Sequence, residues 1–127
     1  MRVLLDTNII SALFKGEDEI ASKIDKATQV YIPLIVLGEL YYGAYNSLHV
    51  HKNIENILQL STRYELAGID DITTKAYGAI KAALKKNGTP IPENDIWIGA
   101  IALRNDYTII TRDKHFKEIK GINIKHW

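Results

Sequence analysis

The sequence contains no cysteine. Disulfide bonds, thiolate zinc sites and cysteine nucleophiles are therefore excluded, and the composition fits a reducing compartment such as the cytoplasm. A large excess of either charge is also missing, because 16 Lys and Arg face 15 Asp and Glu for a formal net charge of +1. This balance excludes a polybasic nucleic-acid binder, so any contact with nucleic acid requires a local patch.

A hydrophobic run long enough to cross a membrane is missing too. The longest apolar stretch, residues 31–37, contains Pro33, whereas a membrane span needs ~18 apolar residues. Near the N-terminus, Asp6 interrupts the apolar residues before an export signal could form. We therefore expect a cytoplasmic protein with no membrane association.

What remains has the composition of an ordinary globular protein. Apolar residues make up 46% of the 127 residues and charged residues 24%, close to the globular averages of about 45–50% and 25%. A chain of this length is typical of one domain and can bury a substantial core. We therefore expect a single domain over residues 1–127.

Apolar runs of β type alternate with stretches of helical spacing along the chain. The predicted strands are residues 2–5, 29–32, 65–69 and 107–111, with residues 123–125 as a further candidate. The predicted helices are residues 8–14, 17–27, 33–45, 48–60, 70–87 and 94–104. This alternation predicts the α/β class, with a parallel sheet covered by helices on both faces.

Carboxylates follow two of the predicted strands. Asp6 comes directly after residues 2–5, and Asp113 comes shortly after residues 107–111. Ligands of open parallel sheets bind beyond the carboxyl ends of the strands. If these two strands are neighbours, Asp6 and Asp113 share one edge of the sheet.

Two further acids lie on helices that are otherwise apolar. Asp95 opens the helix of residues 94–104 on the same stripe as Ile98 and Ala102. Glu39 lies within the helix of residues 33–45 and has no capping role there. Because an uncompensated buried carboxylate is costly, Glu39 requires a cationic partner or a metal.

Each acid also has an ordinary structural explanation when it is taken alone. Asp6 could be a helix cap, Asp95 a first-turn acid and Asp113 a turn residue. Their joint placement favours one acidic pocket. No histidine or cysteine cluster accompanies the acids, so the pocket suits a hard cation such as Mg²⁺, or Mn²⁺ in its place. Cations held in this way serve phosphate chemistry.

Four segments resemble the motifs of PIN-domain proteins, and in particular those of the VapC toxins of bacterial and archaeal toxin–antitoxin pairs. The resemblance covers essentially the whole chain, with the motifs in the family's order. The segments are Leu5-Asp6-Thr7-Asn8-Ile9-Ile10, Leu37-Gly38-Glu39-Leu40-Tyr41-Tyr42-Gly43, Pro92-Glu93-Asn94-Asp95-Ile96-Trp97-Ile98-Gly99-Ala100 and Thr111-Arg112-Asp113-Lys114-His115-Phe116.

The resemblance implies a PIN-like α/β/α sandwich with a central parallel sheet and Mg²⁺-dependent RNA cleavage. It also implies a homodimer and inhibition by a cognate VapB-type antitoxin. One departure is that Gly99 stands where many members have Ala. The implied catalytic and metal-binding residues are Asp6, Glu39, Asp95 and Asp113, and the implied supporting polar residues are Thr7, Asn8 and Thr111.

Arg112 and Lys114 are candidate contacts to RNA phosphates, because the end of the chain is locally basic; a solvated face explains them equally well.

Two other functions stay open at this point. A receiver-like phosphoacceptor or Mg²⁺-dependent phosphatase also places acids at strand ends, but typically wants an adjacent acid pair where Asp6 stands alone. A non-catalytic scaffold would use the acids only as caps, and it leaves Glu39 unexplained.

Overall fold

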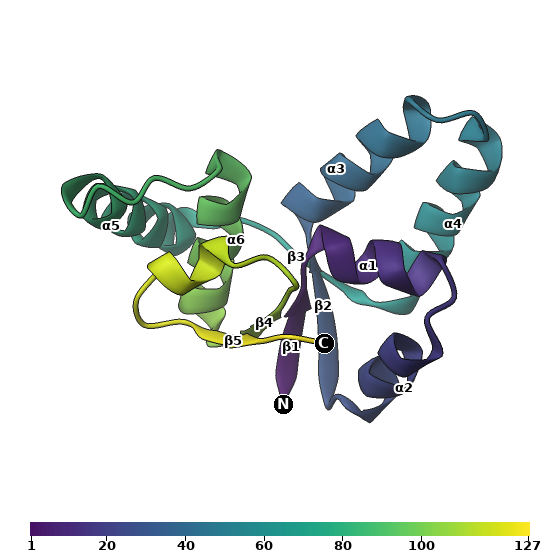
Figure 1. Ribbon diagram of the computed structural model, residues 1–127, viewed down its shortest axis with the longest axis horizontal. Helices are drawn as coiled ribbons and strands as arrows, with labels where there is room; N and C mark the ends of the chain where they lie inside the picture. The colour runs from purple at the N-terminus through teal and green to yellow at the C-terminus, as the bar shows by residue number, and fades with distance from the viewer.

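A five-stranded parallel sheet forms the centre of the molecule in a computed structural model that describes residues 1–127 (Figure 1). The strand order is β3-β2-β1-β4-β5, and every neighbouring pair is parallel. The strands are β1 (Arg2–Leu5), β2 (Gln29–Pro33), β3 (Glu65–Ala67), β4 (Thr108–Ile110) and β5 (Asn123–Lys125). All five strands lie where the sequence pattern predicts strands.

The central strand shows why the chain forms this kind of sheet. Val3, Leu4 and Leu5 of β1 are fully buried, as expected for a parallel strand that is covered on both faces. In the register of the sheet, Leu5 pairs with Ile110 of β4. The ends of β1 and β4 are therefore level with each other, which places the residues after them side by side.

Helices cover both faces of the sheet (Figure 1). One face carries α1 (Thr7–Phe14), α2 (Asp18–Lys26), α3 (Leu34–Tyr45) and α4 (Val50–Arg63), and the other carries α5 (Asp71–Lys86), α6 (Glu93–Asn105) and the 3₁₀ helix η1 (His115–Glu118). The predicted α/β/α sandwich with a central parallel sheet is confirmed. None of the helices combines the length and the apolar character that a membrane span requires.

The connections that follow β1 and β4, which run parallel to each other, lie on opposite faces of the sheet. After β1 the chain enters α1 on one face of the sheet, whereas after β4 it enters η1 on the other (Figure 1). The two connections leave a crevice between them at the carboxyl ends of these strands, where open α/β sheets bind their ligands. The fold thus places the segments after Leu5 and Ile110 at a ligand-binding edge.

Candidate active site

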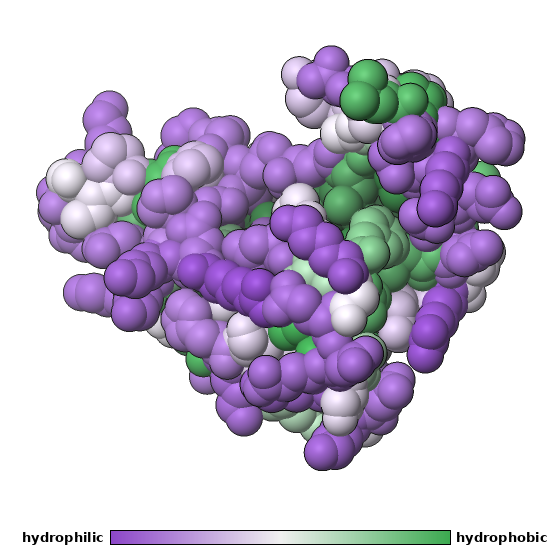
Figure 2. All heavy atoms as spheres, turned by 45° about the vertical axis from the view of Figure 1, so that its right-hand side comes forward, coloured by the Kyte–Doolittle hydropathy of each residue, from purple (hydrophilic) through white to green (hydrophobic).

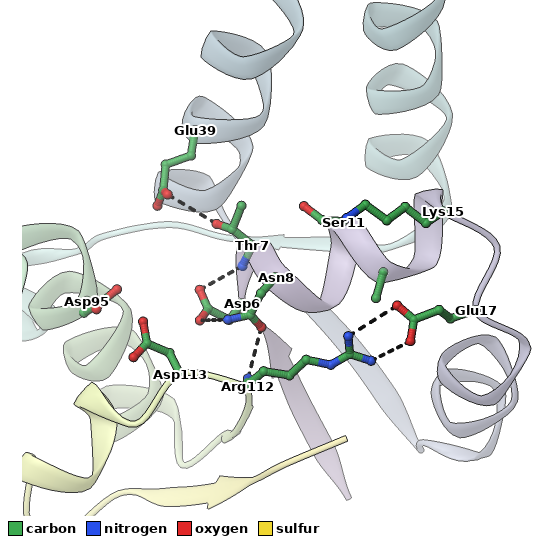
Figure 3. Close-up of a pocket in the computed structure, with 11 residues that line it drawn as sticks. Asp6, Thr7, Asn8, Ser11, Lys15, Glu17, Glu39, Asp95, Arg112 and Asp113 are labelled. Carbon is green, nitrogen blue, oxygen red and sulfur yellow. Dashed lines mark hydrogen bonds and ion pairs between the residues drawn. The ribbon is translucent and has the colours of Figure 1, made fainter.

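One cavity of about 460 Å³ opens at this edge, and all four predicted acids line it (Figure 3). Asp6 follows β1 and Asp113 follows β4, so both come from the carboxyl ends of neighbouring strands. Glu39 reaches the cavity from α3 and Asp95 from the first turn of α6. The structure brings together side chains that lie as far apart as 107 positions in the sequence.

Asp6 is the most deeply buried of the four, with 5% of its surface exposed. It is the N-cap of α1, and its Oδ1 accepts a hydrogen bond of 2.8 Å from the backbone N–H of Thr7. Its Oδ2 accepts bonds from the Thr111 hydroxyl at 2.7 Å and from the Asn8 amide at 3.3 Å. Burial raises the pKa of Asp6, and these hydrogen bonds oppose the increase. Asp6 is therefore both a helix cap and an oriented member of the cavity.

Asn8 and Thr111 connect the two strand ends. The Asn8 side-chain oxygen accepts the backbone N–H of Arg112 at 3.1 Å. The buried Thr111 hydroxyl accepts the backbone N–H of Asp113 at 2.9 Å while it donates to Asp6. These predicted supporting residues thereby fix the position of Asp113 relative to Asp6.

Glu39 is half-buried and faces Thr7, whose hydroxyl lies 3.4 Å from Glu39 Oε2. Burial and the nearby charge of Asp6 raise the pKa of Glu39. The sequence predicts a cationic partner or a metal for this carboxylate, and no lysine or arginine forms an ion pair with it. The Glu39 carboxylate therefore has no lysine or arginine to neutralise its charge.

The pKa of Asp95 is raised to about 6, first by burial and then by the charges of Asp6 and Asp113. Its stripe along α6 is confirmed, since Ile98 and Ala102 are buried beneath it. No lysine or arginine pairs with Asp95 or Asp113 either. A cavity of converging carboxylate oxygens that no lysine or arginine pairs with fits a divalent cation.

Comparisons with known proteins agree with this geometry. A family model described as PIN domain matches residues 3–122. Ribonuclease VapC2 of Haemophilus influenzae is 30% identical over 130 residues, which cover 100% of this chain and 98% of that protein. The tRNA(fMet)-specific endonuclease VapC of Salmonella typhimurium is 30% identical with the same coverage. The chain belongs to the VapC family of PIN-domain ribonucleases.

A solved structure supports the same assignment. The crystal structure of VapBC2 from Rickettsia felis bound to a DNA fragment from their promoter contains a chain that superposes with a TM-score of 0.93. That chain is 29% identical in sequence, and the match covers 100% of this chain and 99% of that one. Membership of the VapC family does not favour the receiver-like alternative.

The two basic residues predicted to contact RNA have different positions in this VapC-family chain. Arg112 lines the cavity, but its guanidinium forms a two-point ion pair with Glu17, with N–O distances of 2.8 and 3.3 Å (Figure 3). The pairing lowers the pKa of Glu17. Lys114 is exposed and does not line the cavity. Sequence reasoning missed the Glu17 contact, because nothing local links positions 17 and 112.

Sequence reasoning also missed His115. Its ring nitrogen Nδ1 lies 3.2 Å from Asp95 Oδ2 and 3.1 Å from Asp113 Oδ1. A single histidine therefore lies beside the predicted acids, although no cluster of histidines does. The available signal was the position of His115 two residues after Asp113, but its closeness to Asp95 depends on the turn into η1.

Proposed function

We propose that this chain is a Mg²⁺-dependent endoribonuclease and the toxin of a type II toxin–antitoxin pair. It hydrolyses RNA phosphodiester bonds by the attack of water. Asp6, Glu39, Asp95 and Asp113 hold the divalent cation, and Thr7, Asn8 and Thr111 orient the acids. The relatives whose names describe ribonucleases support the choice of RNA as substrate.

One observation carries this proposal: four carboxylates converge on one cavity without a lysine or arginine partner. Such an arrangement is unfavourable by itself, since the pKa values of Asp6, Glu39 and Asp95 are all raised. It is also unsuited to receiving a phosphodiester anion directly. Both difficulties disappear when a divalent cation shares the cavity.

The four acids would bind the cation, and the neighbouring polar residues orient the acids. When bound, a divalent cation neutralises the phosphodiester and lowers the pKa of a water molecule. The three hydrogen bonds that Asp6 accepts keep its carboxylate in one orientation toward the cavity. The Thr111 hydroxyl bonds both Asp6 and the Asp113 backbone, so the two acids keep a constant spacing.

A groove beside the acidic cavity supports a protein partner, which we take to be a VapB-type antitoxin. The groove has a volume of about 520 Å³ and shares Thr7, Ser11, Lys15 and Glu39 with the cavity. Its apolar wall comes from α1, α3 and α4 through Phe14, Leu40, Ala44 and Ile57, on the side where Figure 2 shows hydrophobic atoms exposed among hydrophilic ones. A segment lying there could place an Arg or Lys against the carboxylates.

Exposed aromatic and aliphatic side chains on α3 support the proposed homodimer. Leu34, Tyr42 and Tyr45 are 47%, 72% and 69% exposed. Large apolar residues gathered on one surface helix are typical of protein–protein contacts. The family also supports a cytoplasmic location, where RNA and an antitoxin are both accessible.

The test compares RNA cleavage by the purified wild type with that of Asp6→Asn and Asp95→Asn. Each amide keeps the shape of the side chain but removes charge that holds a hard cation. We expect both variants to lose cleavage by at least about a hundredfold while they stay folded. Glu55→Gln, an exposed acid on α4, is the matched control and should cleave at the wild-type rate. Wild-type cleavage by either cavity variant at saturating Mg²⁺ would contradict the proposal.

A further inference from the structure

His115 reaches the acid cluster from the start of η1, two residues after Asp113. Asp95 lies in α6, Asp113 in the loop after β4, and His115 opens η1. One ligand atom from each of these residues lies within 4.8 Å of the other two. The imidazole nitrogen Nδ1 is the member that contacts both carboxylates, at 3.2 and 3.1 Å.

These distances match those between ligands of one shared ion. Two atoms that each bind an ion at about 2.1 Å, in adjacent octahedral positions, lie about 3.0 Å apart. The nitrogen of His115 has this spacing from Asp95 Oδ2 and from Asp113 Oδ1 at the same time. Because all three atoms lie within 4.8 Å of one another, one ion could join them after their side chains move together.

The position of His115 is set by its backbone and not by burial of its ring. The His115 N–H donates to Asp113 Oδ1 at 3.0 Å, and the next residue, Phe116, is fully buried. The imidazole itself is 50% exposed. Polar contacts with the two carboxylates, and not packing, therefore orient the ring, and substituting it leaves the buried anchor in place.

We propose that His115 is a nitrogen ligand of the divalent cation, together with Asp95 and Asp113, and that it biases the site toward Mn²⁺ over Mg²⁺. The inference rests on the proposed function, because it concerns the same cation. Mg²⁺ favours oxygen ligands and binds through carboxylates and water, whereas imidazole suits first-row transition metals. A mixed nitrogen and oxygen set therefore raises the affinity for Mn²⁺ more than that for Mg²⁺.

The test measures metal affinity by calorimetry for the wild type, His115→Gln and the control His126→Gln, which changes an exposed histidine near the C-terminus. We expect His115→Gln to weaken Mn²⁺ binding by about tenfold or more and Mg²⁺ binding by less than about twofold. His126→Gln should match the wild type for both ions. Pulsed electron paramagnetic resonance of bound Mn²⁺ should detect ¹⁴N coupling in the wild type and none in His115→Gln.

Two results would overturn the inference: absence of ¹⁴N coupling in the wild type, or equal loss of Mg²⁺ and Mn²⁺ affinity in His115→Gln. The second result would mean that His115 only positions the carboxylates. Asp95→Asn separates these failures from failure of the proposed function. If Asp95→Asn abolishes metal binding while His115→Gln leaves it unchanged, the cation site is supported and the proposed role of His115 is contradicted. If neither substitution changes metal binding, both proposals fail.

Discussion

Asp6 and Asp95 face the same cavity but receive different support from their surroundings. Asp6 accepts hydrogen bonds from Thr7, Asn8 and Thr111, whereas Asp95 has only His115. Burial raises the pKa of both carboxyl groups, and the charge of Asp6 adds to the increase at Asp95. The pKa of Asp95 is about 6 as a result. In the metal-free protein, ionisation of Asp95 is thus a major source of unfavourable electrostatic free energy.

Asp95 should make the metal-free protein less stable as the pH rises. The folded pKa of about 6 lies above the ordinary value of 3.8, so the folded state binds more protons than the unfolded state between these values. The free energy of unfolding then falls as the pH increases from about 4 through about 6. In EDTA at pH 8, Asp95→Asn should melt about 4 °C above the wild type, which corresponds to about 1 kcal/mol after allowance for solvent screening.

Melting curves of both proteins at pH 4 and pH 8 measure this difference. At pH 4 the two melting temperatures should nearly coincide, because the folded wild type is then protonated at Asp95. Glu55→Gln controls for the loss of a surface charge elsewhere. A gap between wild type and Asp95→Asn that does not change with pH would contradict the electrostatic explanation.

Arg112 should contribute to RNA affinity even though Glu17 holds it in the free protein. Both partners are partly exposed, so a phosphate can compete with Glu17 for the guanidinium. In an Asp6→Asn background, which prevents cleavage, Arg112→Gln should lower the slope of log affinity against log salt by about 0.7. Lys26→Gln, at the exposed end of α2, should leave the slope unchanged. If Arg112→Gln leaves the slope unchanged, Arg112 does not contact an RNA phosphate.

At the scale of elements, the spacing of apolar residues and the residues that cap helices predict most of the fold. The strand alternation, the N-cap region at Asp70 and the end of α5 near Asn87 all follow from local patterns. Boundaries are less accurate: β3 ends at Ala67 and not at residue 69, and α4 extends to Arg63 and not to residue 60. Strand ends depend on the register with neighbours, which local sequence does not contain.

The acids were predictable because each lies at a position that the topology brings to one edge. Asp6 and Asp113 follow strands, and Asp95 and Glu39 interrupt apolar helix faces. His115 was not predictable, because η1 is a single short 3₁₀ helix without a periodic signal. The Glu17–Arg112 ion pair depends on tertiary placement across 95 positions. Contacts of this kind need the assembled sheet.

The close packing of α6 against Ile119, the residue that follows η1, gives a prediction at the element scale. A Cβ added at Gly99 would lie 2.6 Å from Cδ1 of Ile119. Gly99→Ala should therefore gain about 1 kcal/mol in helix propensity but lose about 1–3 kcal/mol to overpacking. Ile119→Val removes the obstructing methyl group and costs about 1 kcal/mol by itself. The double variant should be more stable than the sum of the single changes by about 1 kcal/mol.

Urea unfolding of the four proteins in this cycle provides the measurement. If the changes in the free energy of unfolding are strictly additive, Ile119 moves aside freely. The contact with Ile119 then does not limit which residue fits at position 99. A positive coupling would show that the side chain opposite determines which residue fits at position 99.

At the scale of the whole molecule, a cation should stabilise the fold because it binds only the assembled cavity. If the dissociation constant for Mg²⁺ is about 1 mM, 10 mM Mg²⁺ adds roughly 1.4 kcal/mol to the free energy of unfolding. For a chain of 127 residues this corresponds to an increase in melting temperature of about 5 °C. Asp95→Asn should respond much less in the same thermal-shift measurement. Equal Mg²⁺ shifts in the two proteins would place the ion outside the cavity.

The chemistry of the product ends tests most directly whether a carboxylate-held cation lets water cleave RNA in this cavity. Attack by water on a phosphodiester needs no histidine pair to activate the 2′-hydroxyl of the RNA. Mapping the ends made by purified wild type in Mg²⁺ should identify 5′-phosphate and 3′-hydroxyl groups. EDTA and Asp6→Asn should each abolish the products. Ends that carry 2′,3′-cyclic phosphate, formed equally well in EDTA, would contradict the account.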